Sequence, residues 1–144
     1  MLNRFQSFVT GITTCYKSIQ RIKAAEMTEF GLKGTHVMCL FFLHHNAEAL
    51  TAAQLCQLCG EDKAAISRTL VTLQEQGYIE TDAKKYRSHI RLTDSGVDIA
   101  QAMDHLIEQW VGAGGLGISE QERDTFYHVL DVISSNLYNS TKNS

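Results

Sequence analysis

The spacing of apolar residues departs from the helical pattern in one segment of this chain, and that departure limits the fold more than any other feature. Apolar residues recur at helical steps of three and four in the segments 3–25, 35–45, 52–59 and 63–76. Between residues 78 and 92 they form two short, partly alternating runs, which predict a small hairpin. Helical spacing then returns. The sequence therefore predicts a mainly α fold of about six helices with a two-stranded hairpin after the fourth.

Residues with known capping preferences predict where the middle helices begin and end. Thr51 and Asp62 are suitable N-caps for the third and fourth helices. Gly60 and Gly77 are suitable left-handed terminators of the same two helices. Two short helices joined by a tight turn and followed by a hairpin form a helix-turn-helix with a wing.

The last third of the chain is predicted to form two further helices. Thr93 can cap a helix over about 94–111, and the glycine-rich run 112–117 then interrupts it. A capping box at 119–122 opens the last helix, which has one apolar face. Residues 139–144 are expected to be disordered.

The charge of the chain is unevenly distributed. The net charge is −3, which by itself argues against a nucleic-acid partner. From residue 94 to the end there are eight acidic residues and two basic ones, whereas 83–91 holds four basic residues and no acidic one. A basic tip on an acidic body suits a protein that contacts a polyanion at one place.

The composition is typical of a globular chain and argues against a membrane-spanning one. Hydrophobic residues make up 44% and charged residues 20%, and the longest strongly apolar stretch, 37–43, is too short to cross a bilayer. No signal peptide is evident, so we expect a cytoplasmic protein without membrane partners. In that compartment Cys15, Cys39, Cys56 and Cys59 are expected to remain thiols.

Three segments, in this order and spacing, resemble the MarR family of bacterial transcription regulators. The segment 55–68 (LCQLCGEDKAAISR) is similar to the family's L-A-x-x-L-G-x-(D/S)-x-x-x-(V/I)-(S/T)-R run. The segment 73–79 (LQEQGYI) resembles L-x-x-x-G-(L/Y)-(I/V), and 90–96 (IRLTDSG) contains the L-T-x-x-G that follows the wing. Residues 31–40 and the capping box at Ser119 also resemble family features, so the resemblance covers nearly the whole chain.

This resemblance implies an organisation and a function. It implies one compact domain made of an N-terminal dimerisation helix with a connector (1–34), a winged helix-turn-helix DNA-binding lobe (35–93) and C-terminal dimerisation helices (94–144). It implies a homodimer that binds double-stranded DNA at a pseudo-palindromic operator, most often as a repressor. It also implies that a small aromatic or phenolic ligand or an oxidant modulates DNA binding.

The fourth predicted helix combines small residues with hydrogen-bond donors and acceptors, which suits close approach to base edges in a major groove. The residues expected there are Lys63, Ala64, Ala65, Ser67, Arg68 and Thr69. The residues expected to contact DNA elsewhere are Thr51, Lys84, Lys85 and Arg87. The family's acidic-arginine pair at the wing tip is absent, and we expect Arg87 in the minor groove. Glu61 stands where an apolar residue is common, which predicts a slightly different turn.

Cys15 and His36 are the residues that the resemblance places near an effector pocket. Reactive cysteines need a lowered pKa and a nearby partner, and the sequence shows none for Cys15. A surface or hydrogen-bonded histidine is the alternative for His36.

The sequence predicts no enzyme, no cofactor and no metal centre. Cys56 and Cys59 form a single C-x-x-C pair without a second pair at zinc-ligand spacing, which favours core thiols. Adjacent side chains on a helix point about 100° apart, so His44 and His45 are not expected to share a metal ion. No phosphate-binding loop or nucleophile motif is present. Two alternatives stay open: a winged-helix interaction module without specific DNA binding, and a thiol or metal sensor of the same family.

Overall fold

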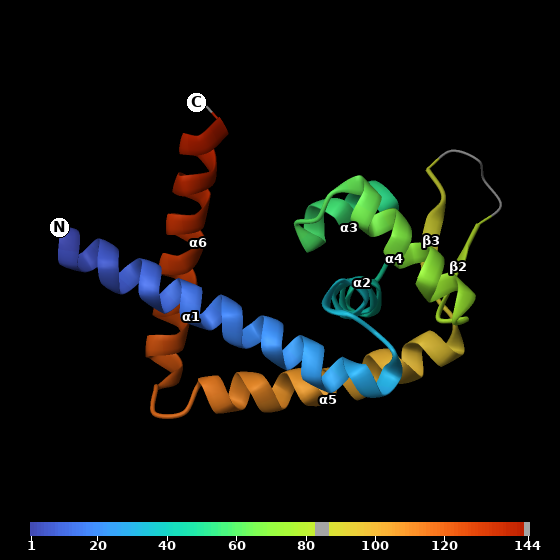
Figure 1. Cartoon of the computed structure of the whole chain (residues 1–144), viewed down its shortest axis with the longest axis horizontal. Coiled ribbons are helices and arrows are strands. Elements are labelled where there is room, and N and C mark those ends of the chain that lie inside the picture. The colour runs from blue at the N-terminus through green and yellow to red at the C-terminus, as the bar shows by residue number, and fades with distance from the viewer. Residues whose placement is uncertain (83–86, 143–144) are drawn as a thin grey trace. The chain divides into compact units, whose positions relative to one another are not determined.

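The computed structural model describes residues 1–82 and 87–142 (Figure 1). In chain order the elements are α1 (Leu2–Met27), the short 3-10 helix η1 (Thr28–Phe30), α2 (Gly34–His45), β1 (Leu50–Thr51), α3 (Ala52–Cys59), α4 (Lys63–Glu75), β2 (Ile79–Thr81), β3 (His89–Leu92), α5 (Asp94–Gly114) and α6 (Glu120–Lys142). Contacts divide the chain into two compact units, Met1–Asp104 and His105–Ser144. Within the described ranges, no helix combines the length and the apolar character that crossing a membrane requires.

The predicted fold class is confirmed: the chain is mainly helical, with a small antiparallel sheet. The helices predicted at 35–45, 52–59 and 63–76 agree with α2, α3 and α4 to within one residue at each end. The predicted hairpin is formed by β2 and β3. The spacing of apolar residues and the capping residues were therefore sufficient to predict the helices and the hairpin of this part of the chain.

Two predictions at the C-terminal end are wrong. Residues 139–144 were expected to be disordered, yet α6 continues to Lys142. The glycine-rich break over 112–117 begins later than expected, because α5 includes residues up to Gly114. Extending an existing helix adds a hydrogen bond for each residue fixed, whereas a glycine costs only about 1 kcal/mol, so extension prevails over weak local propensity.

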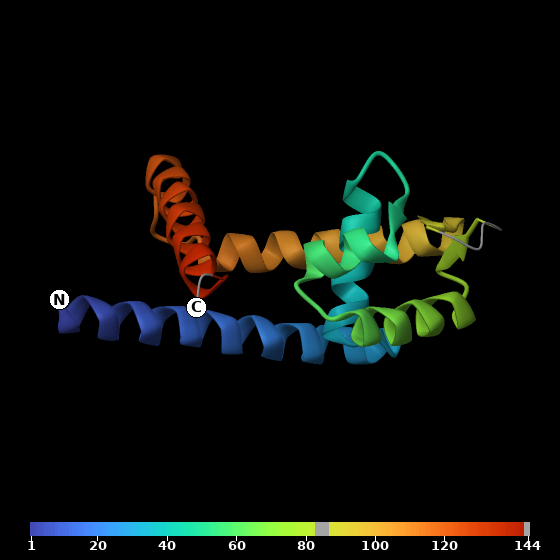
Figure 2. The same ribbon diagram turned by 90° about the horizontal axis from the view of Figure 1, so that it is seen from above.

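Helix α2 forms the centre of the first unit (Figures 1 and 2). It contacts α1, α3, α4 and β3. Its buried residues are His36, Val37, Cys39, Leu40 and Leu43. Around them lie the buried apolar side chains Met27, Leu55, Ile66, Leu73, Ile90, Ile99 and Met103. The nearly all-round apolar character of this segment thus reflects a helix covered on several sides by its own chain.

The sheet contains one strand that the alternating pattern did not predict. The strand order is β1-β3-β2, and both pairings are antiparallel. Leu50 of β1 lies opposite Ile90, and Ile79 of β2 lies opposite Leu92. Because β1 has only two residues, it is too short for alternation to be visible in the sequence. It attaches the start of α3 to the wing.

The residues between α4 and α5 explain why the second and third sequence motifs occur together. Gly77 ends α4 in the left-handed region, with φ +77°. The hydroxyl of Thr93 donates to the carbonyl of Gly77 at 2.6 Å and accepts the N–H of Gly96 at 3.1 Å. A side chain on Gly96 would overlap the carbonyl oxygen of Tyr78. These contacts fix α5 against the end of α4 and the start of the wing.

The second unit contains the predicted capping box. The N–H of Ser119 donates to Oε2 of Glu122 at 2.8 Å, and the N–H of Glu122 donates to Oγ of Ser119 at 3.3 Å. The N–H of Ser119, and its hydroxyl, which donates to the same carboxylate oxygen at 2.9 Å, hold the pKa of Glu122 below its usual value. No residue of α6 is buried. Its exposed large apolar residues are Phe126, Tyr127, Val129, Val132, Leu137 and Tyr138.

Candidate nucleic-acid interface

Two capped helices and a left-handed turn build the helix-turn-helix. Oγ1 of Thr51 accepts the N–H of Gln54 at 3.2 Å, and Oε1 of Gln54 accepts the N–H of Thr51 at 2.8 Å. Gly60 ends α3 with φ +65°, and the N–H of Glu61 then donates to the carbonyl of Cys56. Glu61 is exposed, so a charged residue is accommodated at this turn.

Helix α4 presents a polar and basic face to solvent. Its N-cap, Asp62, accepts the N–H of Ala65 at 2.7 Å. We call the exposed residues Lys63, Ala64, Ser67, Arg68 and Val71 the outer face of α4. Small residues at its first turns leave the backbone accessible, and Lys63 and Arg68 place two positive charges on the same face.

One predicted site residue is wrong and one was missed. Thr69 is 4% exposed and lies with Ile66 and Leu73 on the inner side of α4, so it cannot face DNA. Thr69 lies three residues after Ile66 and four before Leu73, which is the spacing of one buried helical face. Its polar side chain hid this position from a prediction based on apolar residues. Val71 is 56% exposed, in helical register with Ala64 and Arg68. Ala65 is half-buried at the edge of this face.

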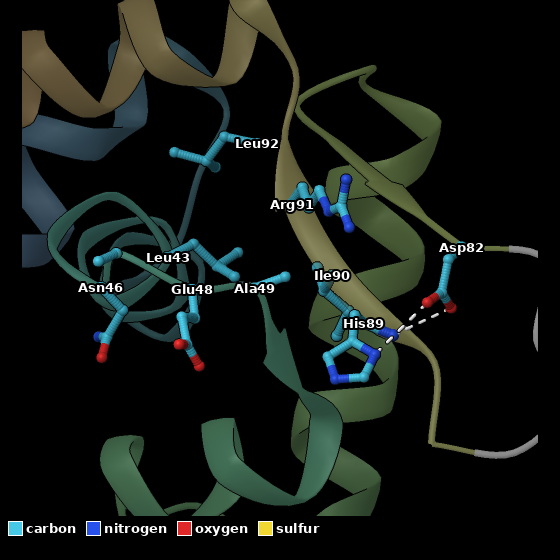
Figure 3. Close-up of a pocket in the computed structure, with 10 residues that line it drawn as sticks. Leu43, Asn46, Glu48, Ala49, Asp82, His89, Ile90, Arg91 and Leu92 are labelled. Atoms are coloured by element: carbon cyan, nitrogen blue, oxygen red, sulfur yellow. Dashed lines mark hydrogen bonds and ion pairs between the residues drawn. The ribbon is translucent and has the colours of Figure 1, made fainter.

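The base of the wing is closed by a polar pair (Figure 3). The N–H of His89 donates to Oδ1 of Asp82 at 3.1 Å, and the imidazole Nδ1 lies 3.4 Å from Oδ2. Arg87 is exposed, with a left-handed φ of +53°. Lys84 and Lys85, which were expected to contact DNA, lie outside the described residues.

A broad hollow of about 700 Å³ lies beside this wing base. The residues that line it include Leu43, Asn46, Glu48, His89 and Arg91, from the end of α2, the following loop and β3 (Figure 3). None of the predicted site residues that the structure describes lines this hollow.

The two residues predicted for an effector pocket have separate surroundings. Cys15 is exposed on α1. His36 is buried, and its Nδ1 accepts the N–H of Lys33 at 2.9 Å at the start of α2. Burial, and then the nearby Lys33 charge, lower the pKa of His36. His36 is thus hydrogen-bonded, as one form of its alternative has it, and it is buried rather than at the surface.

A smaller hollow of about 160 Å³ lies between α1, the start of α2 and the end of α3. It is lined by Gln20, Lys23, Gly34, Thr35, Met38, Cys59 and Glu61. Cys15 and His36 are not among these residues.

Cys59, at the edge of the smaller hollow, contacts a second thiol. Its Sγ lies 3.8 Å from Sγ of Cys39. The hydrogen bond between them lowers the pKa of Cys59, and the same contact together with burial raises the pKa of Cys39. Cys39 is a buried thiol, whereas Cys56 and Cys59, which were expected to be core thiols, are half-buried.

Together, the capped helix pair and the three-stranded wing define a winged helix-turn-helix protein. Residues 30–87 match the family model described as MarR family. A MarR family transcriptional regulator from Listeria monocytogenes, complexed with a 26mer DNA, has 17% identity and a TM-score of 0.84, covering 92% of this chain and 89% of that one.

Two further solved structures have the same fold. Staphylococcus aureus MepR, in its DNA-binding conformation, has 19% identity and a TM-score of 0.83, covering 90% of this chain and 98% of that one. A MarR/EmrR family transcriptional regulator from an Acinetobacter species has 20% identity and a TM-score of 0.81, covering 96% of this chain and 99% of that one. Residues 30–87 are thus similar to the MarR family, and the chain has the winged helix-turn-helix fold of these solved structures.

Proposed function

We propose that this protein is a cytoplasmic transcriptional regulator that binds double-stranded DNA as a homodimer, and that it is not an enzyme. The observation that carries the proposal is the outer face of α4. It is polar and basic, it lies beside the wing in the same unit, and among the described residues of that unit no other element covers it. Structural neighbours described as DNA-bound or DNA-binding support the same use of the fold.

The contacts follow from the geometry of such a complex. The outer face of α4 enters the major groove, where Arg68 and Ser67 reach base edges and Lys63 meets phosphate. Val71 offers an apolar contact of the kind that recognises a thymine methyl group. The further contacts that we propose are Ala65, Thr51, Lys84, Lys85 and Arg87, the last in the minor groove. Thr69 is withdrawn from this set because it is buried.

The homodimer is proposed from apolar side chains that a single chain leaves in water. Along α1 the stripe Phe5, Val9, Ile12, Tyr16 and Ile19 is between 40% and 66% exposed. On α6, Phe126 and Leu137 are 53% and 52% exposed. Large exposed apolar stripes mark interaction surfaces, and a second copy of the chain is the partner that a pseudo-palindromic operator requires. The segments 1–34 and 94–144 are proposed as the dimerisation region.

Modulation by a small ligand or an oxidant is proposed from the smaller hollow and its thiol pair. Lys23 places a cation beside a hollow that has room for a small molecule such as an aromatic or phenolic acid. Cys59 is the thiol of lowered pKa, and a peroxide would oxidise it to a sulfenic acid. Sγ of Cys39 is close enough to attack this sulfenic sulfur, so that the S–O bond breaks, water leaves and a disulfide forms. Either event acts on DNA binding only through a difference in affinity between two states, and loss of binding would relieve repression.

Selection of duplexes from sheared genomic DNA tests the proposed DNA binding. Purified protein should retain a few promoter fragments that share an inverted repeat, with half-sites about one helical turn apart. Arg68→Ala should lose most of this retention, whereas Lys142→Ala, which removes one cation from the end of α6, should keep it. Retention that is uniform among fragments and erased by moderate salt would contradict specific binding and favour the interaction-module alternative.

A further inference from the structure

Two adjacent histidines at the end of α2 and one aspartate of α5 form a compact cluster in the first unit. Nε2 of His45 lies 2.8 Å from Oδ1 of Asp104, and Nε2 of His44 lies 3.4 Å from Oδ2 of the same carboxylate. Ligand atoms of the three residues all lie within 4.8 Å of one another. Among the described residues, this is the one group of three metal-ligating side chains so close together.

The convergence of the two imidazoles corrects the expectation drawn from helix geometry. The 100° separation applies to the bonds that leave the backbone, whereas Nε2 of each ring lies several bonds further out. The two rings meet edge to face, with centroids 5.0 Å apart. The ring of Phe41 lies 4.5 Å from that of His45 between centroids and limits its rotation. The rings are therefore held toward Asp104 by packing as well as by hydrogen bonding.

The chemistry of the three side chains suits a divalent transition metal. Zinc takes imidazole nitrogens and carboxylate oxygens at about 2.0–2.2 Å, so neighbouring ligand atoms around a tetrahedral ion lie about 3.3 Å apart. The observed separations of 2.8 Å and 3.4 Å lie on either side of that spacing. An ion bound by these atoms would replace the present contacts between the imidazole nitrogens and the carboxylate oxygens.

We propose that His44, His45 and Asp104 bind one divalent transition-metal ion of the zinc type, with water completing the coordination. Side-chain exposures of 21%, 46% and 25% let an ion reach the ligands without opening the core. Because His45 and Asp104 are 59 positions apart in sequence, the ion ties the end of α2 to α5. Three protein ligands and an open position are the arrangement of a regulatory or reactive site rather than of a closed structural one.

Metal titration tests the proposal without any reference to DNA. Untagged protein, first treated with a chelator, is titrated with zinc chloride by calorimetry and with cobalt chloride by absorption spectroscopy. We expect one equivalent of either ion per chain and a higher midpoint of thermal unfolding with zinc. His44→Gln, His45→Gln and Asp104→Asn should each weaken zinc binding at least about tenfold, since even outer-shell partners are worth about 10–100-fold.

Matched variants separate this cluster from other ligands. His105→Gln removes the exposed histidine next to Asp104, and Cys59→Ser removes a half-buried thiol; both should leave zinc affinity unchanged. Asp104→Glu keeps the carboxylate and should retain binding, which distinguishes loss of a ligand from misfolding. The proposal is overturned if the wild-type chain binds no zinc, or if the three ligand variants bind it normally. It also fails if the cobalt-bound wild-type chain shows a thiolate-to-cobalt absorption band and Cys59→Ser loses both this band and zinc binding, because Cys59 would then be a ligand.

Discussion

Helices α2 and α6 both carry apolar residues at helical spacing, yet their surroundings differ. Leu40 of α2 is 0% exposed, whereas Phe126 of α6 is 53% exposed. The apolar side chains of α2 are covered by α1, α3, α4 and β3 of the same unit. Hydrophobic period thus predicts that a helix forms and which of its faces is apolar, but not what covers that face. For α6, the proposed cover is a second copy of the chain.

The largest expected effect comes from making the exposed apolar stripe of α6 that contains Phe126 and Leu137 polar. The double variant Phe126→Gln, Leu137→Gln should convert a dimer of about 32 kDa, twice the 16.1 kDa chain, into a monomer. Each such side chain contributes roughly 2 kcal/mol when fully buried, and both copies lose two of them. Light scattering over a range of concentrations measures this change.

Tyr127→Gln is the control for the α6 variant. Tyr127 is 54% exposed on the same helix, but it lies outside the stripe that contains Phe126 and Leu137. The control protein should remain dimeric. A monomeric wild-type protein, or a double variant that is still dimeric, would show that this stripe has a different partner.

Truncation of α2 should instead destabilise the chain independently of protein concentration. Leu40→Ala removes a fully buried side chain from the centre of the first unit and should cost about 2–5 kcal/mol of unfolding free energy. The loss of unfolding free energy is measured by denaturant unfolding at two protein concentrations, both low enough for the dimer to be dissociated. The loss should be the same at both concentrations. Val71→Ala, at an exposed position of α4, is the matched surface control. If both variants were equally stable, α2 could not be the central helix of a cooperative core.

Gly96→Ala should destabilise the junction between α4, the wing and α5. The added methyl group overlaps the carbonyl oxygen of Tyr78, a backbone atom that cannot rotate away. Overpacking of this kind costs about 1–3 kcal/mol. Gly112→Ala, where the added carbon meets nothing within 4 Å, should leave stability unchanged or raise it slightly. Equal unfolding midpoints for the two variants would contradict the tight contact.

The sequence was sufficient for most of the fold because its signals were local. Caps at Thr51, Asp62 and Ser119 and left-handed glycines at Gly60 and Gly77 act within a few residues, and the structure contains all of them. Strand β1 could not be predicted, since two residues pair with β3 only after distant parts of the chain have met. The prediction that residues 139–144 are disordered was wrong, because helix extension outweighed their polar composition and α6 continues to Lys142.

The candidate site was predicted less completely, for reasons of side-chain direction. Composition placed Thr69 with its neighbours on the outer face of α4, whereas packing directs it inward. Sequence separation also concealed two clusters: Cys39 with Cys59, and His44 and His45 with Asp104. Each cluster joins different helices, so only the tertiary arrangement brings its members together.

The smallest expected effect on stability concerns the capping box at the start of α6 rather than the second copy proposed to cover its apolar face. Ser119→Ala removes the N-cap hydroxyl and should cost about 1 kcal/mol of unfolding free energy, with no change in dimer mass. The pKa of Glu122 is lower in the folded chain than in the unfolded one. The contribution of the capping box is therefore present above the unfolded carboxyl pKa of about 4.3 and is lost as pH falls through the folded value. Unfolding measured between neutral pH and that range should show the difference between wild type and Ser119→Ala shrinking in acid. A difference that stayed constant would mean that the hydroxyl acts alone, without the carboxylate.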